Sequence, residues 1–150
     1  MTEQNKPYPV LYVIVRNDLE SMNPGKAEAH SGHAACQFMY ENVVQKLEGN
    51  IGVNDIVKVW MKAGNGFGTQ INLDGSFEDI CSIEDYLENL ICWGGKDVIL
   101  YKEVLDPTYP YIDMVTGECR TRCEVTAFYV FGMSDNARLK SAVGKLRLKP

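Results

Sequence analysis

The side chains best suited to chemistry lie in one stripe of an Ala-rich segment. From Lys26 to about Leu47 the chain has no proline and one internal glycine, Gly32, so this segment predicts a helix. At about 100° per residue, a narrow stripe of that helix carries Lys26, His30, His33 and Gln37. The stripe starts at the helix N-terminus, where unpaired N–H groups and the helix dipole favour an anion. A cation and two imidazoles there suit anion binding or proton transfer near neutral pH.

Another side of the same helix carries small residues. It consists of Ala29, Gly32, Ala35, Cys36, Met39 and Val43. We expect this side to pack on a sheet, because small side chains allow a helix and a sheet to approach closely.

A carboxylate follows one of the expected strands. Asp106 ends the strand predicted over residues 97–105 and opens the turn-rich stretch Asp-Pro-Thr-Tyr-Pro-Tyr. Aspartate before proline often forms a turn, and the end of a strand in an open α/β sheet is where ligands collect. Both interpretations of Asp106 stay open. Tyr109 and Tyr111 could stack on an unpaired base or cover the edge of a core.

The elements that must position these residues alternate between strands and helices. Strands are expected over residues 8–16, 69–73, 97–105 and 122–131. Helices are expected over residues 26–47, over 77–92 with Gly94-Gly95 closing the helix, and over 135–143 with Ser134 as cap. Residues 53–63 suit either a strand or a short helix. The alternation predicts a layered α/β domain spanning residues 1–150.

Composition restricts the class of protein. The chain has 150 residues, 45% apolar and 23% charged, which predicts one soluble globular domain. Its apolar runs are too short for a membrane span, and the polar N-terminus predicts a cytoplasmic protein. Five cysteines are most simply free thiols. Cys119 and Cys123 are close enough in sequence for a zinc site, but without a second pair this signal is weak.

Charge is unevenly distributed along the chain. The net charge of −5 argues mildly against a surface that embraces nucleic acid as a whole. Residues 77–88 carry acids without a base, whereas residues after Asp135 carry bases without an acid. The basic segment, which includes Lys145, could meet a phosphate-bearing partner, or the two segments could be solvated faces of opposite sign.

The residues around the first strand and helix resemble a known family. Val13-Ile-Val-Arg-Asn-Asp-Leu19, Met22, Gly25-Lys26, Ala27, Ala29 and His33-Ala34-Ala35 are similar to the opening of the type 2 peptidyl-tRNA hydrolases, approximately V-V-R-x-D-L-x-M-x-x-G-K-x-A-A-Q-x-x-H-A-A. Val143-Gly-Lys-Leu-Arg-Leu148 resembles the closing V-x-G-x-L-K-L. The resemblance spans about the whole chain, and its specific part is the first third.

The resemblance implies a fold and an activity. The fold would be a three-layer sandwich in which a four-stranded mixed β-sheet carries helices on both faces. The activity would be hydrolysis of the ester that links a peptide to the 3′ end of tRNA, which recycles the tRNA. No cofactor and no metal are implied. The acceptor end of tRNA would be the partner, no membrane is implied, and a homodimer is an open alternative.

The resemblance also implies roles for individual residues. Lys26 would be the family's lysine at the helix start, placed to hold a phosphate or the developing oxyanion. Asp106 would orient or deprotonate the attacking water, and Thr126 would hold substrate or water. His30 stands where the family has glutamine and could donate a hydrogen bond or act as a base. The expected substrate contacts are His33, Thr108 and Lys145.

Departures from the family pattern support two other hypotheses. Gly32 replaces the usual serine, and about eight extra residues separate Asp106 from Cys123. The first alternative is therefore a non-catalytic module on the same fold that binds RNA or protein. The second is a metal-dependent hydrolase that uses His30 and His33, whose i, i+3 spacing permits shared ligation although no carboxylate motif accompanies them.

Overall fold

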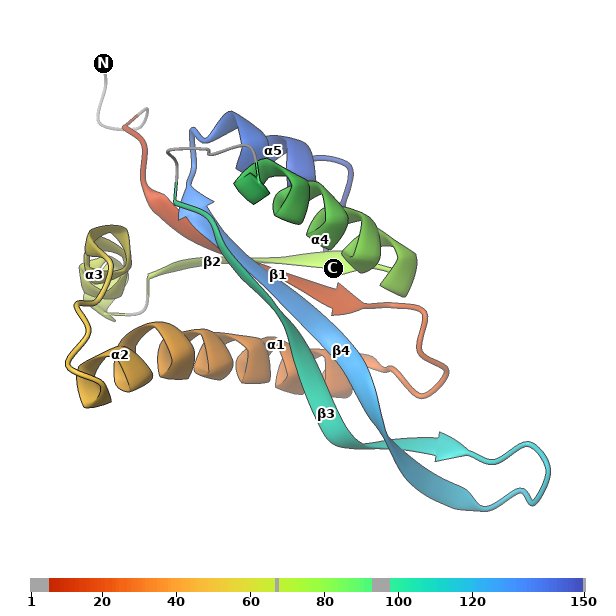
Figure 1. Ribbon diagram of the computed structural model, residues 1–150. Coiled ribbons are helices and arrows are strands. Elements are labelled where there is room, and N and C mark those ends of the chain that lie inside the picture. Colours follow the sequence, from red (N-terminus) through yellow and green to blue (C-terminus); the bar gives the residue numbers. More distant parts are fainter. Residues whose placement is uncertain (1–5, 67, 93–97, 150) are drawn as a thin grey trace.

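A mixed β-sheet forms the centre of the molecule. The computed structural model describes residues 6–66, 68–92 and 98–149. Their strands lie in the order β3-β4-β1-β2-β5. The bounds are β1 Pro9–Arg16, β2 Thr69–Gly75, β3 Leu100–Ile112, β4 Cys119–Met133 and β5 Arg147–Leu148. β1 and β2 are parallel and the other neighbours are antiparallel, which confirms an α/β domain with a mixed sheet (Figure 1).

The expectation of four strands is wrong, because the described residues form a five-stranded sheet. The added strand is β5, where Arg147 pairs with Asp74 and Leu148 pairs with Leu73 of β2. Lys149 Nζ lies 2.7 Å from a carboxylate oxygen of Asp74 and fixes the same edge. A strand of two residues is too short to show an alternating pattern in the sequence. β5 can therefore be identified only from its pairing with β2.

The helix predicted over residues 26–47 forms as α1 Pro24–Met39, the π-helical turn η2 Tyr40–Val44 and α2 Gln45–Glu48. Asn23 caps it, since its side-chain oxygen accepts a hydrogen bond from the Lys26 N–H at 3.0 Å. Pro24 occupies the first turn, where its missing N–H costs no hydrogen bond.

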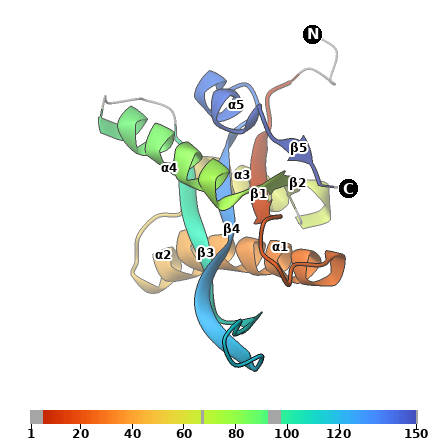
Figure 2. The ribbon, with the colours of Figure 1, turned by 90° about the vertical axis from the view of Figure 1, so that its right-hand side faces the viewer.

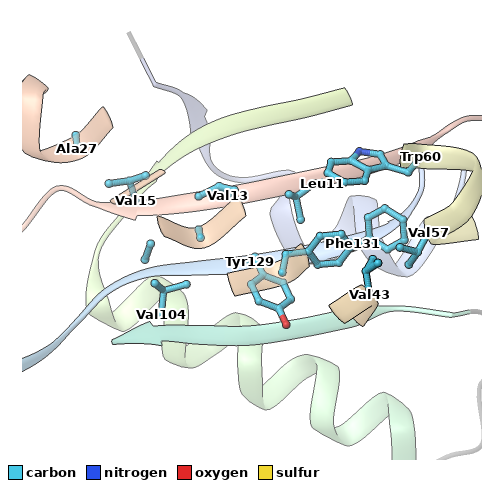
Figure 3. Close-up of a cluster of buried hydrophobic side chains, with 13 residues drawn as sticks. Leu11, Val13, Val15, Ala27, Val43, Val57, Trp60, Val104, Tyr129 and Phe131 are labelled. Atoms are coloured by element: carbon cyan, nitrogen blue, oxygen red, sulfur yellow. The ribbon is translucent and has the colours of Figure 1, made fainter. Parts of the chain in front are cut away.

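The two faces of the sheet carry separate apolar clusters. On one face, Leu11, Val13 and Val15 of β1 pack with side chains of α1 and of α3 Asp55–Lys62 (Figure 3). On the other, Val10 and Ile14 pack with α4 Phe77–Cys92 and α5 Ala137–Val143. Figures 1 and 2 show α1 and α2 on one side of the strands and α4 and α5 on the other.

The face that α1 turns to the sheet differs from the expectation. Its buried residues are Ala27, His30, Ser31, Ala34 and Phe38. Ala29, Gly32 and Cys36, which were expected to pack on the sheet, are exposed. Phe38 decides the rotation, since its ring packs among Trp60, Tyr129 and Phe131 with centroid distances of 5.3, 5.3 and 4.9 Å. Burying that ring stabilises the helix more than a close approach of small residues would.

β3 and β4 form a long hairpin that extends beyond the rest of the sheet (Figure 1). The expected turn at Asp106–Tyr111 is wrong, because β3 continues through it to Ile112. Pairing with β4 shifts register between Val104 and Leu105 and again between Asp106 and Tyr109. β3 is an edge strand, so Pro107 and Pro110 interrupt no hydrogen bonds to a further strand.

Two short helices, α3 and α5, begin at asparagine caps. Residues 53–63 contain the helix α3, capped by the Asn54 side chain, which accepts from the Ile56 N–H. The last helix, α5, is capped by Asn136 and not by Ser134, whose hydroxyl accepts a hydrogen bond from the Tyr8 N–H instead.

The expected helix end at Gly94-Gly95 and strand start at Asp97 lie outside the described residues. Within the described ranges, no helix has the length and apolar character that crossing a bilayer requires.

Candidate functional site

The first turns of α1 face a tyrosine of the hairpin. Lys26 Nζ lies 5.6 Å from the centroid of the Tyr109 ring, and the His30 ring lies 5.8 Å from it. Tyr109 is 2% exposed. Its ring therefore forms a wall that an ammonium and an imidazole approach from the same helix. We call Lys26, His30, His33, Asp106 and Tyr109 the helix-start cluster.

His30 is a buried histidine with an unused nitrogen. The residue is 4% exposed, and its Nδ1 has no hydrogen-bond partner among the residues that the structure describes. Burial lowers the pKa of His30 below its ordinary value, and the positive charges of His33 and Lys26 lower it further, while Asp106 raises it. His30 is thus neutral near pH 7 and can accept a proton or a hydrogen bond.

Asp106 lies at the second register shift of the hairpin. Its Oδ1 accepts hydrogen bonds from the backbone N–H of Thr108 at 2.9 Å and from the Thr108 hydroxyl at 3.2 Å. These bonds fix the orientation of the carboxylate at the irregular part of β3. Asp106 is half-buried, and its charge acts on His30 across the gap between β3 and α1. Thr108 therefore orients the carboxylate that the helix-start cluster uses.

His33 lies one turn beyond His30 and is exposed. The two rings meet edge to face with centroids 5.5 Å apart. In the described part of the chain, no group of three or more His, Cys, Asp or Glu residues is arranged to hold a metal ion. Cys119 and Cys123 are free thiols on the exposed part of β4.

Thr126 and Lys145, the two remaining predicted site residues, lie in different surroundings. Thr126 is completely buried in β4, and its hydroxyl donates to the Val104 carbonyl at 3.5 Å, inside the sheet. Lys145 lines a groove between α4 and α5 together with Asp79 and Tyr86. That groove belongs to the face of the sheet opposite α1 (Figure 1). The structure therefore brings Lys26, His30, His33, Asp106 and Thr108 together, and it does not bring Lys145 to them.

A serine in the loop after β1 holds the hairpin against α1. The Ser21 hydroxyl hydrogen-bonds with the Tyr109 hydroxyl at 2.9 Å and donates to the Pro110 carbonyl at 3.0 Å. Our sequence analysis assigned Ser21 no role. Its contacts join residues 88 and 89 positions apart, and no motif predicts such a pairing.

A buried arginine fixes the base of the hairpin. Arg16 is 8% exposed and pairs with Asp18 at 2.8 Å and with Glu124 at 2.7 Å. Burial alone would raise the pKa of Asp18, but hydrogen bonds from Arg16 and from the Phe77 N–H lower it. In the sequence, Arg16 belongs to the Val-Arg-x-Asp-Leu motif. That motif did not predict that Arg16 pairs with two carboxylates.

An open groove lies beside the helix-start cluster. Its volume is about 560 Å³, and it runs between the loop after β1 and the outer part of the hairpin. Tyr109 lines it and also contacts the His30 ring and the Lys26 ammonium, so the groove adjoins the cluster. We call it the hairpin groove.

Comparison with models of known protein families found no match for this chain, and comparison with curated proteins found no significant relative.

Proposed function

We propose that the protein is a cytoplasmic hydrolase that cleaves the ester between a peptide and the 3′ end of tRNA, on a three-layer peptidyl-tRNA hydrolase type 2-like scaffold. One observation carries the proposal. The buried His30, whose Nδ1 has no partner among the described residues, contacts the same Tyr109 ring as the Lys26 ammonium, and the charges of Lys26 and Asp106 both act on it. A base, a cation and an orienting carboxylate are the groups that water attack on an ester requires.

The reaction assigns one task to each group. Asp106 and His30 position a water molecule and take its proton as its oxygen bonds to the ester carbonyl carbon. Lys26 and the start of α1 stabilise the negative charge that develops on the carbonyl oxygen. The bond from that carbon to the ribose 3′ oxygen then breaks. The ribose oxygen takes the proton and leaves as the 3′ hydroxyl of tRNA, and the peptide leaves as a carboxylic acid.

Burial of His30 suits this task. A base with a pKa below its ordinary value is unprotonated at cellular pH, so no proton has to be removed before it acts. Its Nδ1 has no partner among the protein groups, so a bound water or substrate hydroxyl would satisfy it. His33 is exposed at the same helix face and would contact the substrate.

The test is hydrolysis of N-blocked aminoacyl-tRNA by the purified chain at low salt. We expect Lys26→Ala and Asp106→Asn to release tRNA at least about a hundredfold more slowly, as loss of an electrostatic or acid–base group does. Lys62→Ala and Asp135→Asn are matched controls, because both residues are exposed and belong to other elements. Equal rates in all four variants would contradict the proposal.

The hairpin favours a second candidate, a non-catalytic binding module. Met114 and Val115 at its tip are 86% and 94% exposed, an unusual place for two apolar side chains. A module that only binds RNA or protein through the hairpin would keep its affinity in Asp106→Asn. Release of tRNA by the wild type and its loss in that variant would exclude this candidate.

A further inference from the structure

Both apolar and charged side chains line the hairpin groove. Leu19 is buried in one wall, and Pro110, Ile112 and Met114 line the other. Ile112 is 52% exposed and Met114 is 86% exposed, so their side chains are available to a ligand. An open apolar groove beside a candidate catalytic cluster is typical of a substrate subsite.

The charges of the groove argue against a phosphate-bearing occupant. Its lining includes Arg16 and Arg122, and also Asp18, Glu20 and Asp113. Both arginines already pair with Glu124, and Arg16 pairs with Asp18 as well. Glu20 is exposed and forms no ion pair among the described residues. Asp113 pairs with Arg120 at 3.2 Å, so Glu20 is the lining carboxylate without an ion pair among the described residues. A polyanion needs unpaired cations, whereas a neutral or basic chain suits the unpaired carboxylate of Glu20.

The groove continues from the candidate catalytic cluster. Tyr109 contacts Lys26 and His30 and also lines the groove. A ligand with one end at Lys26 can therefore extend past Tyr109 towards Met114. In an ester of peptide and tRNA, the peptide is the part that is not polyanionic.

We propose that the hairpin groove binds the peptidyl part of the ester substrate and prefers apolar and basic side chains over acidic ones. This inference rests on the proposed function, because it assigns the peptide and not the tRNA to the space beside the helix-start cluster. Backbone amides of the peptide would lie along the apolar wall of the hairpin. Basic side chains would point to Glu20, because Asp113 already pairs with Arg120 at 3.2 Å.

Peptide binding is measured first, without catalysis. The probes are dansyl-Gly-Leu-Lys-Phe-amide and dansyl-Gly-Leu-Glu-Phe-amide, followed by fluorescence anisotropy with the full chain. We expect the lysine peptide to bind more tightly, and Glu20→Gln to reduce its advantage about threefold. Glu48→Gln is the matched control, since Glu48 ends α2 away from the hairpin (Figure 1).

The apolar wall is tested with the double variant Ile112→Ser and Met114→Ser. Both side chains are exposed, so folding should persist, and we expect both peptides to bind about fivefold more weakly. Val115→Ser is the control, because Val115 is exposed at the same tip but does not line the groove. Unchanged affinity in the double variant, or displacement of the peptides by an RNA ending in CCA, would overturn the proposal.

Hydrolysis then separates the two proposals. The double variant should raise KM for acetyl-Gly-Leu-Lys-Phe-tRNA more than KM for acetyl-glycyl-tRNA, because a single glycine reaches less of the groove. Equal kinetics of the variant and the wild type on both substrates would overturn the groove assignment while the hydrolase stands. Groove-dependent peptide binding without hydrolysis by the wild type would overturn the hydrolase and support a peptide-binding groove.

Discussion

The hydroxyl groups of Ser21 and Tyr109 lie 2.9 Å apart and join the loop after β1 to the hairpin. This contact places the Tyr109 ring beside Lys26 and His30, at centroid distances of 5.6 and 5.8 Å. The loop and the hairpin are far apart in sequence, so the pair closes a long-range connection. Tyr109 thereby serves both as a wall of the helix-start cluster and as a wall of the hairpin groove.

Removing this contact should loosen the hairpin. In Ser21→Ala the Tyr109 hydroxyl and the Pro110 carbonyl both lose their partner, so we expect the free energy of unfolding to fall by about 1 to 2 kcal/mol. We also expect ester hydrolysis to slow, because Tyr109 no longer holds its position against α1. Urea unfolding and the tRNA-release assay measure the two effects. Ser141→Ala, at an exposed position of α5, should change neither; equal effects of both variants would refute a special role for Ser21.

The burial of His30 should make stability depend on pH. Its pKa is lowered in the folded state from an ordinary value of 6.5, so the unfolded chain binds more protons just below that pH. The contribution of a neutral His30 is therefore complete above pH 6.5 and is lost as the pH falls through 6.5 towards the lowered pKa. We expect the free energy of unfolding to fall over that window in the wild type and less steeply in His30→Gln.

The control for this experiment is His33→Gln, since His33 is exposed on the same helix. It should retain most of the pH dependence of the wild type, because burial is the largest cause of the lowered pKa of His30 and the charge of His33 is a smaller one. Parallel stability profiles for the wild type and His30→Gln would show that burial of His30 does not affect proton binding. We also expect the acid limb of the pH–rate profile for ester hydrolysis to shift in His30→Gln, because the proposed mechanism uses His30 as the base.

Local patterns predicted the elements whose side chains repeat over several turns. The helix from Lys26 and the strand β1 have long, consistent runs of suitable residues, and both formed close to the expected bounds. The strand β5 and the outer half of β3 depend on pairing with distant residues. The prolines of β3 predicted a turn. The sequence alone does not indicate that this strand lies at the edge of the sheet, where proline is tolerated.

The candidate site was predicted in its residues more than in its geometry. The stripe of Lys26, His30 and His33 follows from helical spacing, and the structure places Asp106 near it. The helical spacing did not predict the burial of His30, because it led us to expect that the small residues, and not Phe38, pack on the sheet. Tyr109 and Ser21 required the three-dimensional path of the hairpin, which is a tertiary feature.

The position of Phe38 should dominate the stability of α1. Its ring is completely buried among three aromatic side chains, and Phe38→Ala would leave a cavity in the largest described cluster on that face of the sheet. We expect a loss of about 3 to 5 kcal/mol in the free energy of unfolding. Cys36→Ala, two residues earlier and exposed, should change it by less than about 0.5 kcal/mol. Thermal and urea unfolding of both variants measure the contrast; similar losses would place Phe38 outside the core.

One carboxylate should lower stability at neutral pH. Burial and the negative charge of Glu103 are the main causes that raise the pKa of Glu84 above its ordinary value of 4.5, so its charged form is unfavourable in the folded protein. The cost is absent below pH 4.5 and grows as the pH rises through the raised pKa. Glu84→Gln should therefore increase the free energy of unfolding at pH 7 by about 0.5 kcal/mol, a small value because solvent screens the pair.

Glu78→Gln, in the first turn of the same helix, is the control and should give no increase, because a negative charge there interacts favourably with the helix dipole. Urea unfolding at pH 7 and pH 4 compares the two, and a loss of stability in Glu84→Gln at pH 7 would contradict the repulsion between Glu84 and Glu103.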